Sequence, residues 1–289
     1  MAADVAQLDQ EIQGLDRLET PQEAKKPLAV RIWSAVWPKV GAVALALGLW
    51  QLVVLSGWKP EYLLPGPADV FAELWRRTLD GSLVEATLVT LQRGASGFAL
   101  ALVIGVVVGS LVARIRVLRA AFGSFITGLQ TMPSVAWVPL AILLFPFSGQ
   151  QAIFFVVVLG AAPSIANGLI SGVDQIPPLW LRAGHVLGAR GVSLYRHVIL
   201  PAALPTFVAG LKQGWAFAWR SLMAGELIVT AAGQSSLGHT LQISRDLGDA
   251  HGLLATMIII LAVGILVDSL VFGQIEQALL RRRGLLENK

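Results

Sequence analysis

The sequence predicts an all-α integral membrane protein with six membrane-spanning helices, and three observations support this fold class. Of the 289 residues, 55% are hydrophobic and only 14% are charged, and the mean hydropathy is +0.68. Apolar runs of about 20 residues, the length that spans a bilayer, recur along the chain. Basic residues cluster beside these runs, as the positive-inside rule describes. The net charge of +4 therefore indicates a membrane protein and not a nucleic-acid-binding one.

The six expected spans are joined by two short and three longer connections. We place them at residues 38–55, 88–112, 120–147, 151–169, 206–229 and 253–272, within a transmembrane domain of residues 38–289. Residues 1–37 form a polar N-terminal tail without the apolar core of a signal peptide. Residues 68–79 have the spacing of an amphipathic helix that lies in the membrane interface.

The distribution of Lys and Arg predicts the orientation of the chain. With six spans, both termini lie on one side of the membrane. Lys and Arg gather in the tail, after the second and fourth spans and at the C-terminal end, whereas the opposite side holds only Lys59, Arg76, Arg77 and Arg245. The positive-inside rule then places both termini and the loop at residues 179–205 in the cytoplasm.

This cytoplasmic loop reads LWLRAGHVLGARGVSLYRHVILPAALP and predicts a short basic helix–turn–helix. Gly188 can end its first helix in the left-handed backbone conformation, which glycine adopts without penalty. Such an element suits docking to a soluble partner. The alternative is an ordinary loop that its arginines hold at the lipid surface.

The third span is interrupted by prolines, which remove backbone hydrogen bonds. Pro133 and Pro139 flank Trp137. The carbonyls that prolines free inside a bilayer need partners from neighbouring protein or from a water-filled cavity. The interruption therefore indicates either a translocation path or a structural kink.

The fifth span is the most polar and contains Trp215, Trp219, Arg220 and Glu226. A charged residue in a span costs about 2.5–3.5 kcal/mol or more, and it usually faces protein or a water-filled cavity. Arg220 could attract a small oxyanion in transit, or it could form an ion pair with Glu226 or with a neighbouring helix. We expect Arg93, near the outer end of the second span, to extend to the lipid headgroups.

Missing motifs exclude several classes of protein. The chain has no cysteine, which excludes disulfides and thiol chemistry. It also lacks the GxxxxGK[ST] phosphate loop and the HExxH and GxSxG motifs, and its four histidines are scattered. We therefore expect a non-catalytic chain that holds no metal or cofactor of its own.

The segment LRAGHVLGARGVSLYRHVILPAALP resembles the cytoplasmic EAA loop of bacterial ATP-binding cassette (ABC) importer permeases. Ala183, Gly188 and the Leu200–Pro201 pair match the pattern of that loop. Arg182 stands where the family has Glu, and Gly184 stands at its second Ala. The segments LLPGPADVFAELW, MPSVAWVPLAILLF and GWAFAWRSLMAGELI are similar to the nitrate, sulfonate, taurine and bicarbonate branch.

This resemblance implies a type I importer permease in the bacterial inner membrane. The expected partners are a second copy of the permease, a cytoplasmic ATPase dimer that binds ATP and Mg²⁺, and an extracytoplasmic solute-binding protein. The expected substrate is a small oxyanion, either an aliphatic sulfonate, taurine, nitrate or bicarbonate. The alternative is a secondary transporter of small anions driven by an ion gradient, for which we would expect inverted repeats. No convincing repeat is found.

Three groups of candidate functional residues follow. Residues expected to couple to the ATPase are Arg182, Ala183, Gly184, His185, Gly188, Ala189, Leu200 and Pro201. Residues expected along the substrate path are Pro133, Trp137, Pro139, Trp215, Trp219, Arg220 and Glu226. Residues of the external loop expected to dock the binding protein, if they are not simply solvated loop charges, are His239, Arg245, Asp246 and His251.

Overall fold

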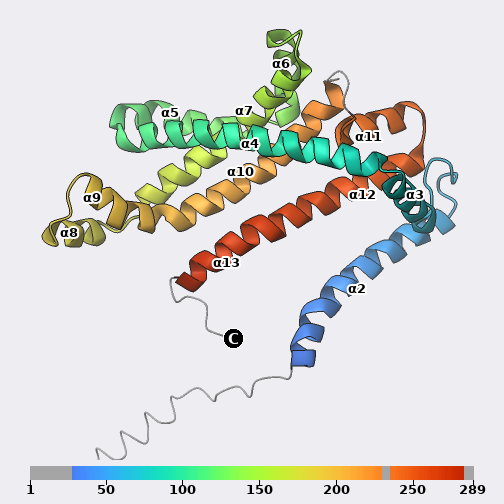
Figure 1. Ribbon diagram of the computed structural model, residues 1–289, viewed down its shortest axis with the longest axis horizontal. Coiled ribbons are helices and arrows are strands. Elements are labelled where there is room, and N and C mark those ends of the chain that lie inside the picture. Colours follow the sequence, from blue (N-terminus) through green and yellow to red (C-terminus); the bar gives the residue numbers. More distant parts are fainter. Residues whose placement is uncertain (1–27, 230–234, 283–289) are drawn as a thin grey trace, which may run out of the picture. The chain divides into compact units, whose positions relative to one another are not determined.

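The computed structural model describes residues 28–229 and 235–282 (Figure 1). Every regular element within these residues is a helix, which confirms the all-α fold class. The chain divides into two units, residues 1–58 and residues 59–289, which are described separately below. Residues 1–27 of the expected N-terminal tail lie outside the described residues.

The described part of the first unit is one long helix, α2 (Leu28–Leu55). Its stretch Val36–Leu55 is long enough to cross a membrane, and its mean hydropathy of 1.7 is high enough. Residues 28–37, assigned to the tail from the sequence, are thus part of the helix that contains the first span.

The second unit holds the remaining helices. Its first half contains α3 (Pro67–Leu79), α4 (Ser82–Arg114), α5 (Arg116–Thr131), η1 (Ser134–Trp137), α6 (Val138–Leu144) and α7 (Gly149–Asp174). Its second half contains α8 (Pro178–Val186), α9 (Val192–Leu194), η2 (Tyr195–Ile199), α10 (Leu200–Ile228), α11 (Leu237–Asp246), α12 (Ala250–Val267), η3 (Asp268–Phe272) and α13 (Gly273–Arg282).

The third expected span is broken at its first proline. Val117–Thr131 and Ser134–Leu144 meet at an angle of 104°. Met132 adopts an extended conformation, with φ −72° and ψ 130°, as expected for a residue that precedes proline. The described residues contain five helices that can cross a membrane, or six if this bent pair is one span.

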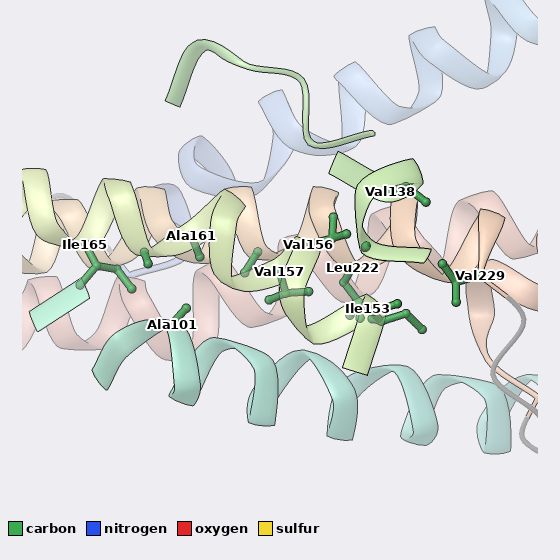
Figure 2. Close-up of a cluster of buried hydrophobic side chains, with 13 residues drawn as sticks. Ala101, Val138, Ile153, Val156, Val157, Ala161, Ile165, Leu222 and Val229 are labelled. Carbon is green, nitrogen blue, oxygen red and sulfur yellow. The ribbon is translucent and has the colours of Figure 1, made fainter. Parts of the chain in front are cut away.

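Helix α7 is the centre of the second unit, because it packs against both α4 and α10. Figure 2 shows the apolar cluster between them, in which Ala101 of α4 and Leu222 of α10 surround Val157, Ala161 and Ile165 of α7. All five side chains are buried. This core fixes α10, which carries the polar residues predicted to be functional.

Small residues let these helices touch through their backbones. A Cβ atom added to Gly168 of α7 would lie 2.6 Å from Cα of Gly210 in α10. A Cβ atom on Gly105 of α4 would lie 2.9 Å from the carbonyl oxygen of Ala162. Such close approach is typical of packed helices in membranes. The hydrophobic effect does not drive helices together there, and small residues instead allow tight van der Waals packing.

The structure corrects the sequence-based description of residues 192–228. The sequence predicted a separate helix–turn–helix over residues 179–205 and a span that begins at residue 206, but one helical stretch runs from Val192 to Ile228. A π-turn at Tyr195–Ile199 makes this possible, since the N–H of Leu200 bonds to the carbonyl of Tyr195. This wider turn lies directly before Pro201, which has no N–H to donate.

Residues 235–252, which were assigned to an external segment from the sequence, also contain more structure than expected. The segment was interpreted as a loop, yet residues 237–246 form α11. The Ser236 hydroxyl caps this helix by accepting a hydrogen bond from the His239 N–H at 3.4 Å.

Candidate functional site

Helix α8 is a rigid element with a well-defined end. Gly188 adopts φ +85°. Its N–H bonds to the carbonyl of His185 at 3.0 Å, and the N–H of Ala189 bonds to the carbonyl of Gly184 at 2.9 Å. This pair of bonds is the Schellman motif, which closes helix ends at a left-handed glycine. The prediction that Gly188 ends the helix is confirmed.

Helix α8 folds back onto the following helical stretch at Gly184, which is buried. A Cβ atom at this position would lie 2.9 Å from Cδ1 of Leu194 and 3.1 Å from Cγ2 of Val198. The glycine that departs from the EAA pattern therefore permits the close contact between α8 and residues 194–198.

The outer side of α8 and of the turn after it is exposed and partly apolar. Leu179, Trp180, Val186, Leu187 and Val192 are between 51% and 87% exposed, and we call them the α8 surface. Arg182, Ala183, His185, Leu200 and Pro201 are also exposed, whereas Ala189 is half-buried. An exposed apolar patch of this kind marks an interaction site.

A buried polar cluster joins α4, α10 and α11 at the far end of α10. Glu226 lies 3.3 Å from Nη1 of Arg93 through its Oε1 atom. Its Oε2 atom accepts hydrogen bonds from Oγ1 of Thr90 at 2.9 Å and from the Gly238 N–H at 3.2 Å. The Leu237 N–H donates to Oγ1 of Thr90 at 2.9 Å. We call these five residues the Glu226 cluster.

The Glu226 cluster overturns two expectations from the sequence. Arg93 does not extend to the headgroups, since its side chain is only 6% exposed. The proposed pair between Arg220 and Glu226 does not form, because Arg93 occupies that place. Glu226 itself is fully buried at the junction with α11, away from the cavity described next.

An open cavity of about 700 Å³ lies between α10 and α12, and Leu261 and Ile265 on its α12 side are 64% and 58% exposed. Helix α10 contributes Trp215, Trp219 and Arg220, and the opposite wall includes Leu261 of α12 and Asp268 of η3. The two indole rings stack with centroids 6.2 Å apart and an interplanar angle of 27°. Of the seven residues predicted for the substrate path, the structure thus brings these three of α10 together.

Charges are distributed unevenly around this cavity. The Arg220 guanidinium lies over the Phe217 ring, 5.2 Å from its centroid, and no carboxylate of the described residues pairs with it. Nζ of Lys212 lies 3.5 Å from Oδ2 of Asp268 and 3.8 Å from Oε2 of Glu276. Asp268 is therefore compensated by Lys212, whereas Arg220 stays available to an anion.

The third-span residues lie elsewhere. Pro133 and Pro139 are exposed, and Trp137 packs partly buried against the core around α7. None of the three lines the cavity between α10 and α12. The proline break and the aromatic cavity are thus separate features within the described residues.

The residues predicted to dock a binding protein surround α11. Arg245 and Asp246 are exposed and pair with each other, Nη2 to Oδ1, at 2.8 Å. His239 and His251 are half-buried.

An ion-pair network that the sequence analysis missed ties α3 to the start of α12. Arg77 bonds to Glu73 at 2.6 Å and to Asp249 at 2.5 Å, and Asp249 caps α12 through the Gly252 N–H at 2.9 Å. Hydrogen bonds from the guanidiniums of Arg76 and Arg77 lower the pKa of Glu73 to about 2. The i, i+3 and i, i+4 spacing of Glu73, Arg76 and Arg77 was the available signal.

Known proteins are similar to this chain in sequence or in fold. The bicarbonate transport system permease protein CmpB of Synechococcus elongatus is 29% identical over 269 residues, which cover 88% of this chain and 94% of that protein. The riboflavin transport system permease protein RibX of Chloroflexus aurantiacus is 32% identical over 249 residues, which cover 85% and 91%. Among solved structures, the inward-facing MetNI methionine ABC transporter matches with a TM-score of 0.58 and 21% identity, covering 68% of this chain and 95% of the matched chain.

The model of the family described as binding-protein-dependent transport system inner membrane component matches residues 101–281. The matched segment includes the broken third span, α8 and the cavity between α10 and α12. The chain therefore belongs to this family and is a multi-pass permease component of an ABC transporter in the inner membrane.

Proposed function

We propose that this chain is the permease subunit of an ATP-driven importer that receives a small anion from a solute-binding protein. The observation that carries the proposal is the continuous helix that extends from the contact with α8 to the cavity. Helix α8 rests on the start of a continuous helical stretch of 37 residues, Val192–Ile228. At 1.5 Å per residue this stretch is about 55 Å long, and it carries Trp215, Trp219 and Arg220.

In this proposal the α8 surface docks in a groove of a cytoplasmic ATPase. ATP and Mg²⁺ are held by that ATPase, and two copies of each chain form the transporter. Closure of the ATPase pair would move α8 as a rigid lever, because the Schellman motif at Gly188 fixes its end. The motion would pass through Gly184 and Leu194 to the helix that lines the cavity.

The outer end of the second unit would receive the binding protein. His239, Arg245, Asp246 and His251 lie on or beside α11, and the Glu226 cluster holds α11 to α4 and α10. A binding protein that moves α11 would therefore act directly on the wall of the cavity. The guanidinium of Arg220, with which no carboxylate of the described residues pairs, supports an anionic substrate, and one relative is named for the transport of an anion, bicarbonate.

The test compares two glycines whose φ angles are nearly equal. Gly188 has φ +85° and Gly81, which precedes α4, has φ +83°, and an added Cβ atom would meet no neighbour at either position. A valine at either position is strained by a similar amount. We expect Gly188→Val to abolish the stimulation of ATP hydrolysis by the binding protein, while the complex still assembles, and Gly81→Val to retain it.

The measurement uses the complex that co-purifies with the tagged chain from its own membrane, reconstituted in vesicles. Vanadate-sensitive ATP hydrolysis is followed with and without the binding protein. Normal stimulation in Gly188→Val would contradict the coupling role of α8. Failure of any ATPase to co-purify, together with uptake driven by an ion gradient, would favour a secondary transporter.

A further inference from the structure

We propose that the cavity between α10 and α12 binds an organic anion with a flat apolar body, such as an arylsulfonate or arylcarboxylate, in preference to a bare inorganic oxyanion. The inference deepens the proposed function, because it names the class of anion that this permease passes. It rests on the size of the cavity, on its lining and on the placement of its charges.

The size of the cavity exceeds what an inorganic ion requires. Its volume of about 700 Å³ falls in the range of roughly 300–1,000 Å³ that is typical of sites for organic ligands. A nitrate or bicarbonate ion has four heavy atoms and is comparable to one or two water molecules of roughly 30 Å³ each. Such an ion would leave most of the cavity to water or lipid.

The lining presents the Trp219 indole, because its neighbour Trp215 is only 7% exposed. Trp215 and Trp219 stack with an interplanar angle of 27°, and Trp215 is held by an edge contact with Phe98 at 5.3 Å. Trp219 lies against Gly264 of α12, where an added Cβ atom would be 3.2 Å from its Nε1 atom. The glycine thus lets the Trp219 indole approach α12. Neighbouring apolar residues of α10, α11 and α12 complete the wall, which suits stacking of an aromatic ligand.

The charges define where the anionic group binds. Arg220 and Asp268 both line the cavity, but Lys212 compensates Asp268 at 3.5 Å. Lys212 precedes Arg220 by two helical turns, a separation of about 12 Å. The anionic group would therefore meet the planar guanidinium of Arg220, whose donors match carboxylate and sulfonate oxygens. The apolar body would extend from there along the Trp219 indole toward the Lys212–Asp268 pair.

The test measures binding to the reconstituted complex in nanodiscs of zwitterionic lipid by isothermal titration calorimetry. The probes are 2-naphthalenesulfonate, ethanesulfonate, nitrate and the neutral 2-naphthalenemethanol. We expect 2-naphthalenesulfonate to bind at least about tenfold more tightly than ethanesulfonate or nitrate, since only this probe combines an aromatic contact with a charged one. Equal or tighter binding of nitrate, or no binding of any probe, would overturn the inference.

Three variants assign the contacts. We expect Arg220→Gln to weaken 2-naphthalenesulfonate roughly 10- to 100-fold and to leave 2-naphthalenemethanol unchanged. Trp219→Leu should weaken the naphthyl probes roughly three- to tenfold and leave ethanesulfonate unchanged. Gly264→Ala adds one methyl group that displaces the Trp219 indole. It should therefore also weaken binding of the naphthyl probes, while the melting temperature of the protein stays unchanged. Trp75→Leu, at an exposed tryptophan of α3, is the matched control.

Further controls separate the other outcomes. Loss of probe binding as anionic lipid replaces zwitterionic lipid, at constant ionic strength, would assign the cavity to a lipid headgroup and overturn the inference. Unchanged affinity for 2-naphthalenesulfonate in both Arg220→Gln and Trp219→Leu would place the probe elsewhere. Absence of ATP-dependent uptake with the binding pattern intact would contradict the proposed function alone, because probe binding does not require ATP.

Discussion

Replacing Glu226 by Gln tests whether the buried polar cluster holds α11 in place. The substitution keeps the shape of the side chain and its contacts with Thr90 and Gly238, but it removes the carboxylate charge that pairs with the buried Nη1 atom of Arg93. Both side chains are almost fully buried, at 6% exposure for Arg93 and 0% for Glu226, so solvent screening is weak. Breaking a buried ion pair in this way typically costs about 3–5 kcal/mol. For a domain of this size, we expect the melting temperature to fall by roughly 6–20 °C.

The assay exploits the absence of cysteine from the chain. Ser244 of α11 is 3% exposed, so a Ser244→Cys background reports the release of α11 as faster reaction with a maleimide. We expect Glu226→Gln to accelerate this labelling strongly and Arg93→Met/Glu226→Gln to restore most of the protection, because neither member of the buried charge pair is then present. Labelling at the wild-type rate in Glu226→Gln, or no recovery in the double variant, would refute the role of the cluster.

Three further substitutions test α8 and the network between α3 and α12. Gly184→Ala introduces the residue that the EAA pattern carries, and it should be tolerated because the Leu194 methyl group can move away. Gly184→Leu should instead separate α8 from residues 194–198 and abolish the stimulation of ATP hydrolysis. Equal ATPase stimulation in the two variants would contradict this reasoning. Because the pKa of Glu73 is lowered to about 2, its carboxylate contributes stability above its ordinary pKa of about 4.3, and this contribution is lost as the pH falls toward 2. Wild type should therefore melt at a higher temperature than Glu73→Gln at pH 7, with the difference shrinking below about pH 4.3; a difference independent of pH would contradict the shift.

Much of the fold follows from local features of the sequence. Apolar run length located the membrane helices, since a bilayer requires about 20 apolar residues whatever their partners. Gly188 and Pro133 acted as predicted, because the conformational freedom of glycine and the missing N–H of proline are properties of single residues. These features set where helices end and break.

The sequence-based predictions were wrong where the structure depends on a contact between distant residues or on an unusual backbone geometry. Arg93 pairs with a residue 133 positions away in the chain, and no periodicity within α4 reveals that partner. The continuous helix across Pro201 depends on the π-turn at Tyr195–Ile199, which shifts the hydrogen-bond ladder by one residue without a composition signal. The cavity likewise lies between α10 and α12, which are distant in the sequence, although Arg220 and its neighbouring tryptophans were identifiable in the sequence.

The requirement for a separate ATPase is the central claim, and uptake by vesicles measures it most directly. The chain is reconstituted alone, with its co-purifying ATPase, and with the ATPase and the binding protein, and ATP-dependent accumulation of the labelled anion inside the vesicles is recorded. Accumulation should occur only in the complete assembly and stop with Gly188→Val. Accumulation by the chain alone under an ion gradient would contradict the account.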